Sequence, residues 1–122
     1  SMAAFDEITN RMNALKSPDP EIRLEVEAGP VRPLFKFNEA TQDLYEIARR
    51  VASTVGLELG QGQYGGGSDG NFTGALGIPT LDGLGVCGDG IHTKQEYLEV
   101  SSLVPRARLL AGLYEALAER NE

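Results

Sequence analysis

The sequence is poor in several residue types on which whole functional classes depend. It contains one cysteine and one histidine, and only 11 Lys and Arg against 18 Asp and Glu. A single cysteine excludes an intrachain disulfide and is typical of a reducing compartment, so we expect a cytoplasmic protein. The net charge of −7 and the lack of a Lys/Arg run disfavour a nucleic-acid partner, because cations supply most of the affinity for the phosphate backbone.

Long apolar runs are missing as well. No stretch comes near the roughly 18 apolar residues that span a bilayer, and no signal-peptide pattern is present, so we expect no membrane partner. The remaining composition, 41% apolar and 24% charged over 122 residues, is typical of a globular domain that can bury a core.

Two segments of the first half have the apolar spacing of an amphipathic helix. Residues 3–16 form the first, which ends where the prolines of SPDP at 17–20 cannot donate a backbone hydrogen bond. The second covers residues 40–55, with Asn38 or Thr41 as its N-terminal cap and Gly56 as a left-handed C-terminal cap.

A third helix is predicted near the C-terminus. Ser101 or Ser102 would cap its start, and Pro105 would lie in its first turn, where proline is tolerated. The expected apolar stripe consists of Leu103, Ala107, Leu110, Leu113 (or Tyr114) and Leu117.

Strand patterns lie between the helices. Residues 21–28, EIRLEVEA, alternate apolar and charged side chains, which predicts a strand with one exposed face. Residues 57–64 suggest a short strand, 69–76 a short helix ended by Gly77, and 80–86 a strand or a buried loop. This alternation predicts an α/β fold for residues 35–122, and the GPVRP sequence at 29–33 predicts a stiff crossing between two structural units.

Residues 65–100 contain most of the candidate binding and metal-ligating residues, including the one cysteine and the one histidine. The GGGSD sequence at 65–69 stands between a predicted strand and helix, where glycines let the backbone approach a ligand and free N–H groups favour an anion. It matches neither the GxGxxG nor the GxxxxGK[ST] phosphate-binding pattern. A tight turn with packing glycines explains it equally well.

Three further residues are ambiguous on local grounds. His92 could bind a metal, but one histidine cannot complete a site that needs three or four ligands, and spacing alone favours a surface histidine. Arg32, between two prolines, is either a solvated charge or a rigid anion clamp. Cys87 is best interpreted as a small buried residue.

Taken together, the ordered motifs resemble a known family. They are GGSD at 66–69, GIP at 77–79, GLG at 83–85, and GIH at 90–92 followed by Glu96 and Tyr97. In this order they are similar to the C-terminal part of the M20 zinc metallopeptidases and deacylases, and within that family to the glutamate carboxypeptidase branch.

The resemblance implies an α/β catalytic domain into which an α+β (ferredoxin-like) lid, often used for dimerisation, is inserted. Residues 1–31 would then be the end of the lid, with its last helix at 3–16 and strand at 21–28. Residues 32–122 would be the C-terminal part of the catalytic domain. The resemblance thus implies a homodimer. A fragment would also leave sheet edges unpaired and apolar helix faces uncovered, so we expect this chain to self-associate.

The resemblance also assigns roles to residues. His92 would ligate one of two zinc ions, while Arg32 and Gly67 would bind the free carboxylate of a peptide or N-acyl amino acid. The other family ligands and the general base have no counterpart here. We therefore expect a fragment without catalytic residues of its own, inactive alone, from a carboxypeptidase or a deacylase. The alternative is a stand-alone, non-enzymatic module that binds a small anion or itself.

Overall fold

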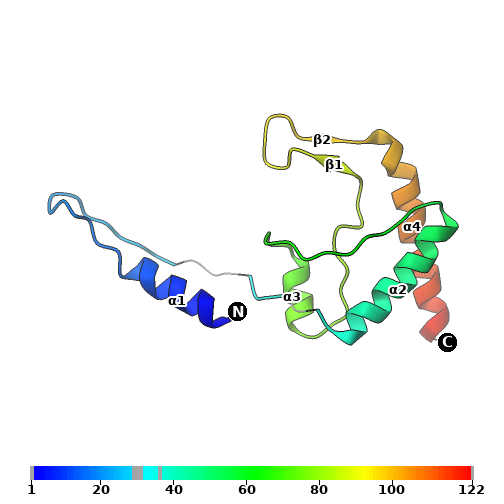
Figure 1. Cartoon of the computed structure of the whole chain (residues 1–122), viewed down its shortest axis with the longest axis horizontal. Coiled ribbons are helices and arrows are strands. Elements are labelled where there is room, and N and C mark those ends of the chain that lie inside the picture. Colours follow the sequence, from blue (N-terminus) through cyan, green and yellow to red (C-terminus); the bar gives the residue numbers. More distant parts are fainter. Residues whose placement is uncertain (1, 29–31, 36, 122) are drawn as a thin grey trace.

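The computed structural model describes residues 2–28, 32–35 and 37–121. Along the chain these form α1 (Met2–Asn13), α2 (Glu39–Thr54), α3 (Gly70–Ala75), β1 (Gly88–Asp89), β2 (Tyr97–Leu98), α4 (Val100–Ala118) and a final 3-10 turn, Glu119–Asn121. Helices α2 and α4 pack against each other, whereas α1 lies apart from both (Figure 1).

The core lies between α2 and α4. Ile47 and Ala48 of α2 and Leu113 of α4 are buried there. Apolar side chains from the connecting segments are packed around them, among them Leu59, Leu81 and Leu84. The two helices approach closely at Gly112, where an added Cβ would lie 2.8 Å from Cγ1 of Val51, so even one methyl group at that position would push them apart.

Both predicted ends of α2 are confirmed. The side chain of Asn38 accepts a hydrogen bond from the Thr41 N–H at 2.8 Å, which settles the N-terminal cap in favour of Asn38. Gly56 has a φ of +74°, and the Leu57 N–H donates to the Ala52 carbonyl at 2.9 Å. This is the Schellman arrangement, in which a left-handed glycine lets the chain satisfy carbonyls of the last turn.

The prediction for α4 is correct in existence but wrong in detail. The helix begins at Val100, with Glu99 rather than Ser101 or Ser102 at the N-cap position, because β2 leads almost directly into it. Pro105 therefore lies beyond the first turn. Of the predicted stripe, Leu113 is buried, Leu117 packs against the core and Leu110 is half-buried, so this part is confirmed, with Leu113 rather than Tyr114 (72% exposed) facing inward. Leu103 and Ala107 are exposed, and Leu109, which the stripe did not include, is buried.

The predicted strands at 21–28 and 57–64 are wrong, since both segments are irregular, and residues 80–86 form a loop and not a strand. Alternation selects a strand only when a neighbouring strand supplies hydrogen bonds, and neither segment has one within the described residues. The ladder of the described chain is antiparallel, pairing Gly88 with Leu98 and Asp89 with Tyr97. A mixture of helices and strands is thus confirmed, but both strands of the described residues lie between α3 and α4, and helices do not alternate with strands along the rest of the described chain.

The N-terminal region agrees with its predicted helix, which forms as α1 and ends at Asn13, three residues earlier than expected. Residues 29–31 of the predicted crossing lie outside the described residues, so the division at 31/32 stays a prediction. Within the described ranges, no helix has both the length and the apolar content to cross a membrane.

Candidate functional site

The structure brings the two predicted carboxylate-binding residues together. A Cβ built on Gly67 would lie 3.2 Å from Cδ and 3.6 Å from Nη1 of Arg32, so the arginine side chain passes directly over the glycine. Nη2 of Arg32 also donates to Oδ1 of Asp69 at 3.1 Å. We call Arg32, Gly67 and Asp69 the arginine corner.

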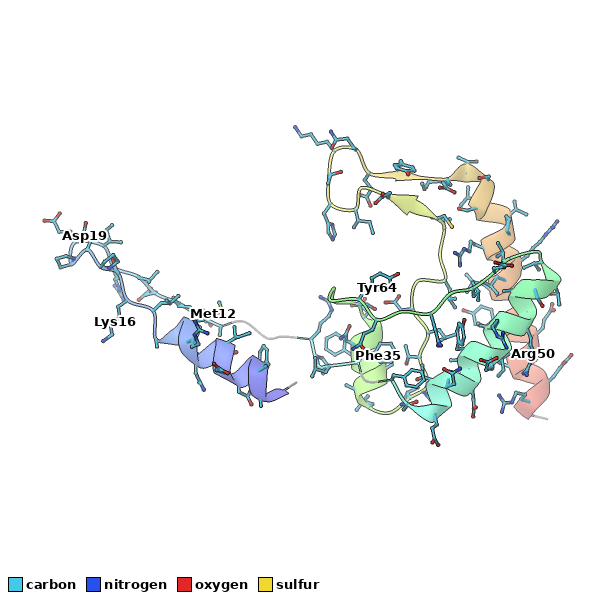
Figure 2. The ribbon with its side chains drawn as sticks, viewed as in Figure 1. Met12, Lys16, Asp19, Phe35, Arg50 and Tyr64 are labelled. Atoms are coloured by element: carbon cyan, nitrogen blue, oxygen red, sulfur yellow. The ribbon has the colours of Figure 1, made fainter. Side chains whose placement is uncertain are left out.

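Two neighbours, Asn71 and Phe35, which no sequence motif marks as site residues, hold this corner in place. Nδ2 of Asn71 donates to the Pro33 carbonyl at 2.7 Å, and Oδ1 of the same amide accepts the Ser68 N–H at 2.9 Å. The ring of Phe35 packs where a Cβ on Gly74 of α3 would be (Figure 2). The segment before α2 is thereby attached to the turn before α3.

Local sequence explains the shape of that turn. Ser68 Oγ accepts the Gly70 N–H at 2.9 Å, while Asp69, at the N-cap position of α3, makes no side-chain capping bond. The Asp69 carboxylate is consequently available to Arg32. Gly77, with a φ of +79°, ends α3 as predicted, and the Ile78 N–H donates to the Thr73 carbonyl at 3.1 Å.

The arginine corner is open to solvent. The side chains of Arg32 and Asp69 are 49% and 94% exposed. An ion pair so exposed contributes only about 0.2–1 kcal/mol, so another carboxylate can compete with Asp69 for the guanidinium. The guanidinium is a planar fork with five N–H donors, and one contact with Asp69 leaves donors for a second anion.

His92 lies elsewhere, in the loop between β1 and β2, which Figure 1 shows apart from α3. Its side chain is exposed and its φ of +65° is the only positive value among the non-glycine residues that the structure describes. Local bonds shape the loop: the Thr93 N–H and hydroxyl both donate to the Gly90 carbonyl, at 3.0 and 2.7 Å. A left-handed backbone costs a non-glycine residue roughly 1–2 kcal/mol, and such strain is typical of functional positions.

A metal ion does not fit the side chains described here as a complete site. Across residues 2–28, 32–35 and 37–121, no three His, Cys, Asp or Glu side chains are grouped closely enough to hold one. Zinc requires three or four protein ligands. His92 could therefore supply at most one ligand of a site that needs others.

Cys87 has a structural contact. Its half-buried thiol accepts a hydrogen bond from Nη2 of Arg106 at 3.5 Å, and its N–H donates to Ser102 Oγ at 2.9 Å. These contacts fix the loop before β1 to α4, in keeping with the predicted packing role, although the residue is not fully buried.

Comparison with known proteins places the chain in a family. Residues 7–116 match the family described as Peptidase family M20/M25/M40. The chain therefore belongs to the M20 peptidases, which confirms the resemblance of the ordered motifs.

Two curated relatives are similar over most of the chain. It is 34% identical over 117 residues to the uncharacterized protein YqjE of Bacillus subtilis (strain 168), covering 96% of this chain and 29% of the relative. It is 30% identical over 113 residues to carboxypeptidase G2 of Pseudomonas sp. (strain RS-16), covering 91% and 27%. The chain thus spans less than a third of the length of these relatives. No solved structure gives a significant match.

Proposed function

We propose that this chain supplies the carboxylate-binding corner of an M20 hydrolase that cleaves an amide bond next to a residue with a free carboxylate. The observation that supports this most directly is the contact of Arg32 with Gly67, two residues far apart in sequence. A cationic fork over an exposed glycine backbone is an arrangement that suits a planar anion.

In the proposed complex the substrate carboxylate lies beside the point where the Arg32 side chain covers Gly67, within reach of both groups. Arg32 donates from the guanidinium N–H groups that Asp69 does not use, and Gly67 donates its backbone N–H, which has no acceptor within the described part of the chain. Such charge-assisted bonds orient the substrate as well as bind it. The name of the Pseudomonas relative favours a carboxypeptidase, while a deacylase of N-acyl amino acids would use the same corner.

For His92 we propose the role of a single zinc ligand. The remaining ligands of a two-zinc site and the general base would come from residues that are not among these 122, so we expect the chain alone to be inactive. The exposed imidazole and the left-handed backbone at His92 support this assignment.

We further propose that residues 1–31 are the end of a lid and dimerisation domain and that α1 contacts a second copy. The molecule exposes 9835 Å², whereas a compact monomer of 13.1 kDa would expose roughly 6,400 Å². Apolar side chains contribute to this excess: Ile8, Met12 and Leu15 are exposed by 55%, 45% and 57%. Large exposed apolar patches typically mark interaction surfaces.

The test is zinc-dependent release of an amino acid from N-acyl amino acids by the complete enzyme, with matched substrates in which the free carboxylate is an amide. Arg32→Ala should lower kcat/KM for the carboxylate substrates by an amount equivalent to a loss of roughly 1.5–3 kcal/mol of transition-state stabilisation, the value of a lost charge-assisted bond. It should leave kcat/KM for the amides nearly unchanged. Arg50→Ala is the control, because Arg50 is an exposed cation on α2. An equal loss on both substrates would show that Arg32 does not bind the carboxylate.

The same enzyme tests His92. His92→Ala should lower zinc content by about one ion per active site and remove nearly all activity. Unchanged zinc content by elemental analysis would exclude His92 as a ligand. If the complete enzyme hydrolyses none of these substrates while the chain still binds glutamate, the non-enzymatic anion-binding module becomes the better interpretation.

A further inference from the structure

We propose that Asn71 is a positioning residue that sets the distance between Arg32 and Gly67 and so determines selectivity for carboxylate-bearing substrates. This inference rests on the proposed function. Asn71 lies in α3 and is half-buried, and its amide makes two hydrogen bonds in opposite senses, to the Pro33 carbonyl and from the Ser68 N–H.

The two partners of the amide are the residues that immediately follow the binding groups. Pro33 follows Arg32, and its ring fixes its own φ, so holding the Pro33 carbonyl restricts where the Arg32 backbone can lie. The Ser68 N–H belongs to the peptide plane shared with Gly67, so holding it orients that plane. One side chain therefore connects both halves of the arginine corner.

The other contacts between the 32–35 segment and the region of α3 do not hold both Arg32 and Gly67. The contact between Arg32 and Asp69 is exposed and reaches only the tip of the arginine. Phe35 packs against Gly74, but Phe35 lies two residues after Pro33 and Gly74 lies three residues after Asn71. This contact is therefore further from both Arg32 and Gly67. Of the described contacts between the two segments, only the Asn71 amide bonds directly next to both Arg32 and Gly67.

The competing explanation is that Asn71 merely stabilises the turn, as Asn and Asp side chains often do over three residues. Such a role would lower activity towards every substrate alike, because the whole active site would be destabilised. A positioning role lowers activity selectively, because only carboxylate substrates use the spacing of Arg32 and Gly67.

The kinetic experiment is Asn71→Ala in the complete enzyme, a change that removes both hydrogen bonds and adds no charge. The ratio of kcat/KM for a carboxylate substrate to that for its amide should fall about tenfold. Thr73→Ala is the matched control: it removes side-chain hydrogen bonds of the same helix, to Gly70 and Thr80, but none to the 32–35 segment, so the ratio should not change.

A second measurement on the 122-residue chain does not depend on hydrolysis. In Asn71→Ala, the NMR signal of the Arg32 Nε–H should move towards that of a freely rotating arginine, and in Thr73→Ala it should stay in place. This arm decides the positioning role even if the complete enzyme proves inactive, an outcome that would contradict the proposed function instead.

The outcomes that overturn the inference are specific. Equal losses on both substrates, or an unchanged Arg32 signal, would reduce Asn71 to a turn residue. If Asn71→Ala does not fold, Asn71→Ser, whose hydroxyl can still accept the Ser68 N–H, gives the same comparison. If both variants are unfolded, Asn71 is needed for folding, and the proposed positioning role is likewise overturned.

Discussion

Helices α1 and α2 have the same amphipathic spacing but very different surroundings. On α2 the apolar side chains are covered by α4, and Ile47 and Ala48 are 4% and 0% exposed. On α1 the equivalent side chains, such as Ile8 and Met12, are about half exposed, and Figure 2 shows the helix apart from α2 and α4. Periodicity thus predicts that a helix forms and which face is apolar, but not what covers that face.

The largest expected difference between the two helices is the cost of removing an isoleucine. Ile47→Ala should lower the free energy of unfolding by about 2–5 kcal/mol, because it leaves a cavity in the core. Ile8→Ala should change it by no more than about 0.5 kcal/mol. Chemical denaturation of the isolated chain measures both.

Similar losses at the two positions would contradict this comparison. They would mean that the α1 face is buried in solution, by a second copy or by the rest of the molecule. Repeating the measurement at two protein concentrations separates these causes, because only contact with a second copy makes the loss depend on concentration.

The next effect concerns self-association through α1. We expect the chain to associate at tens of micromolar, and Ile8→Asp should weaken association about tenfold, or about 1.4 kcal/mol, because a carboxylate resists burial at an apolar contact. Val104→Asp on α4 is the control, since Val104 is similarly exposed, by 59%. Light scattering that gives a strictly monomeric mass for the unmodified chain would exclude this role for α1.

The smallest expected effect on stability comes from comparing the asparagine that caps α2, Asn38, with an asparagine inside α1, Asn10. Asn38→Ala should destabilise the chain by about 1 kcal/mol, since the Thr41 N–H loses its acceptor. Asn10→Ala should be neutral or slightly stabilising, because alanine is the better helix former at an exposed position. Thermal unfolding followed by circular dichroism compares the two; a cost at Asn10 equal to that at Asn38 would contradict the distinction.

The structural features that could be predicted from the sequence are those determined by residues close together in the chain. The Asn38 cap and the left-handed glycines Gly56 and Gly77 follow from side-chain chemistry within a few positions. The prediction of strands at 21–28 and 57–64 is wrong because a strand needs a neighbouring strand to pair with, and no local pattern shows whether one is present. The stripe of α4 is correct at Leu113 and Leu117 but does not include Leu109, because the packing against α2 decides which further side chains are buried.

The same division applies to the candidate site. Arg32 and Gly67 were named through the family resemblance, and the structure brings them into contact. Asn71 and Phe35 were overlooked because their partners lie 38 and 39 positions away. The available signal was an asparagine within a Ser-Asp-Gly-Asn turn, which predicts a capping side chain but not its distant acceptor. The ligand role of His92 stays a prediction.

The left-handed backbone at His92 also limits how this position can change among relatives. Only glycine adopts such a φ freely, and asparagine, aspartate and histidine itself do so more readily than other residues, whereas β-branched residues are strongly disfavoured. In a relative that no longer uses this side chain, drift should therefore lead first to glycine, asparagine or aspartate and rarely to valine or isoleucine. The substitutions tolerated at position 92 would then record the shape of the loop even after its chemistry had been lost.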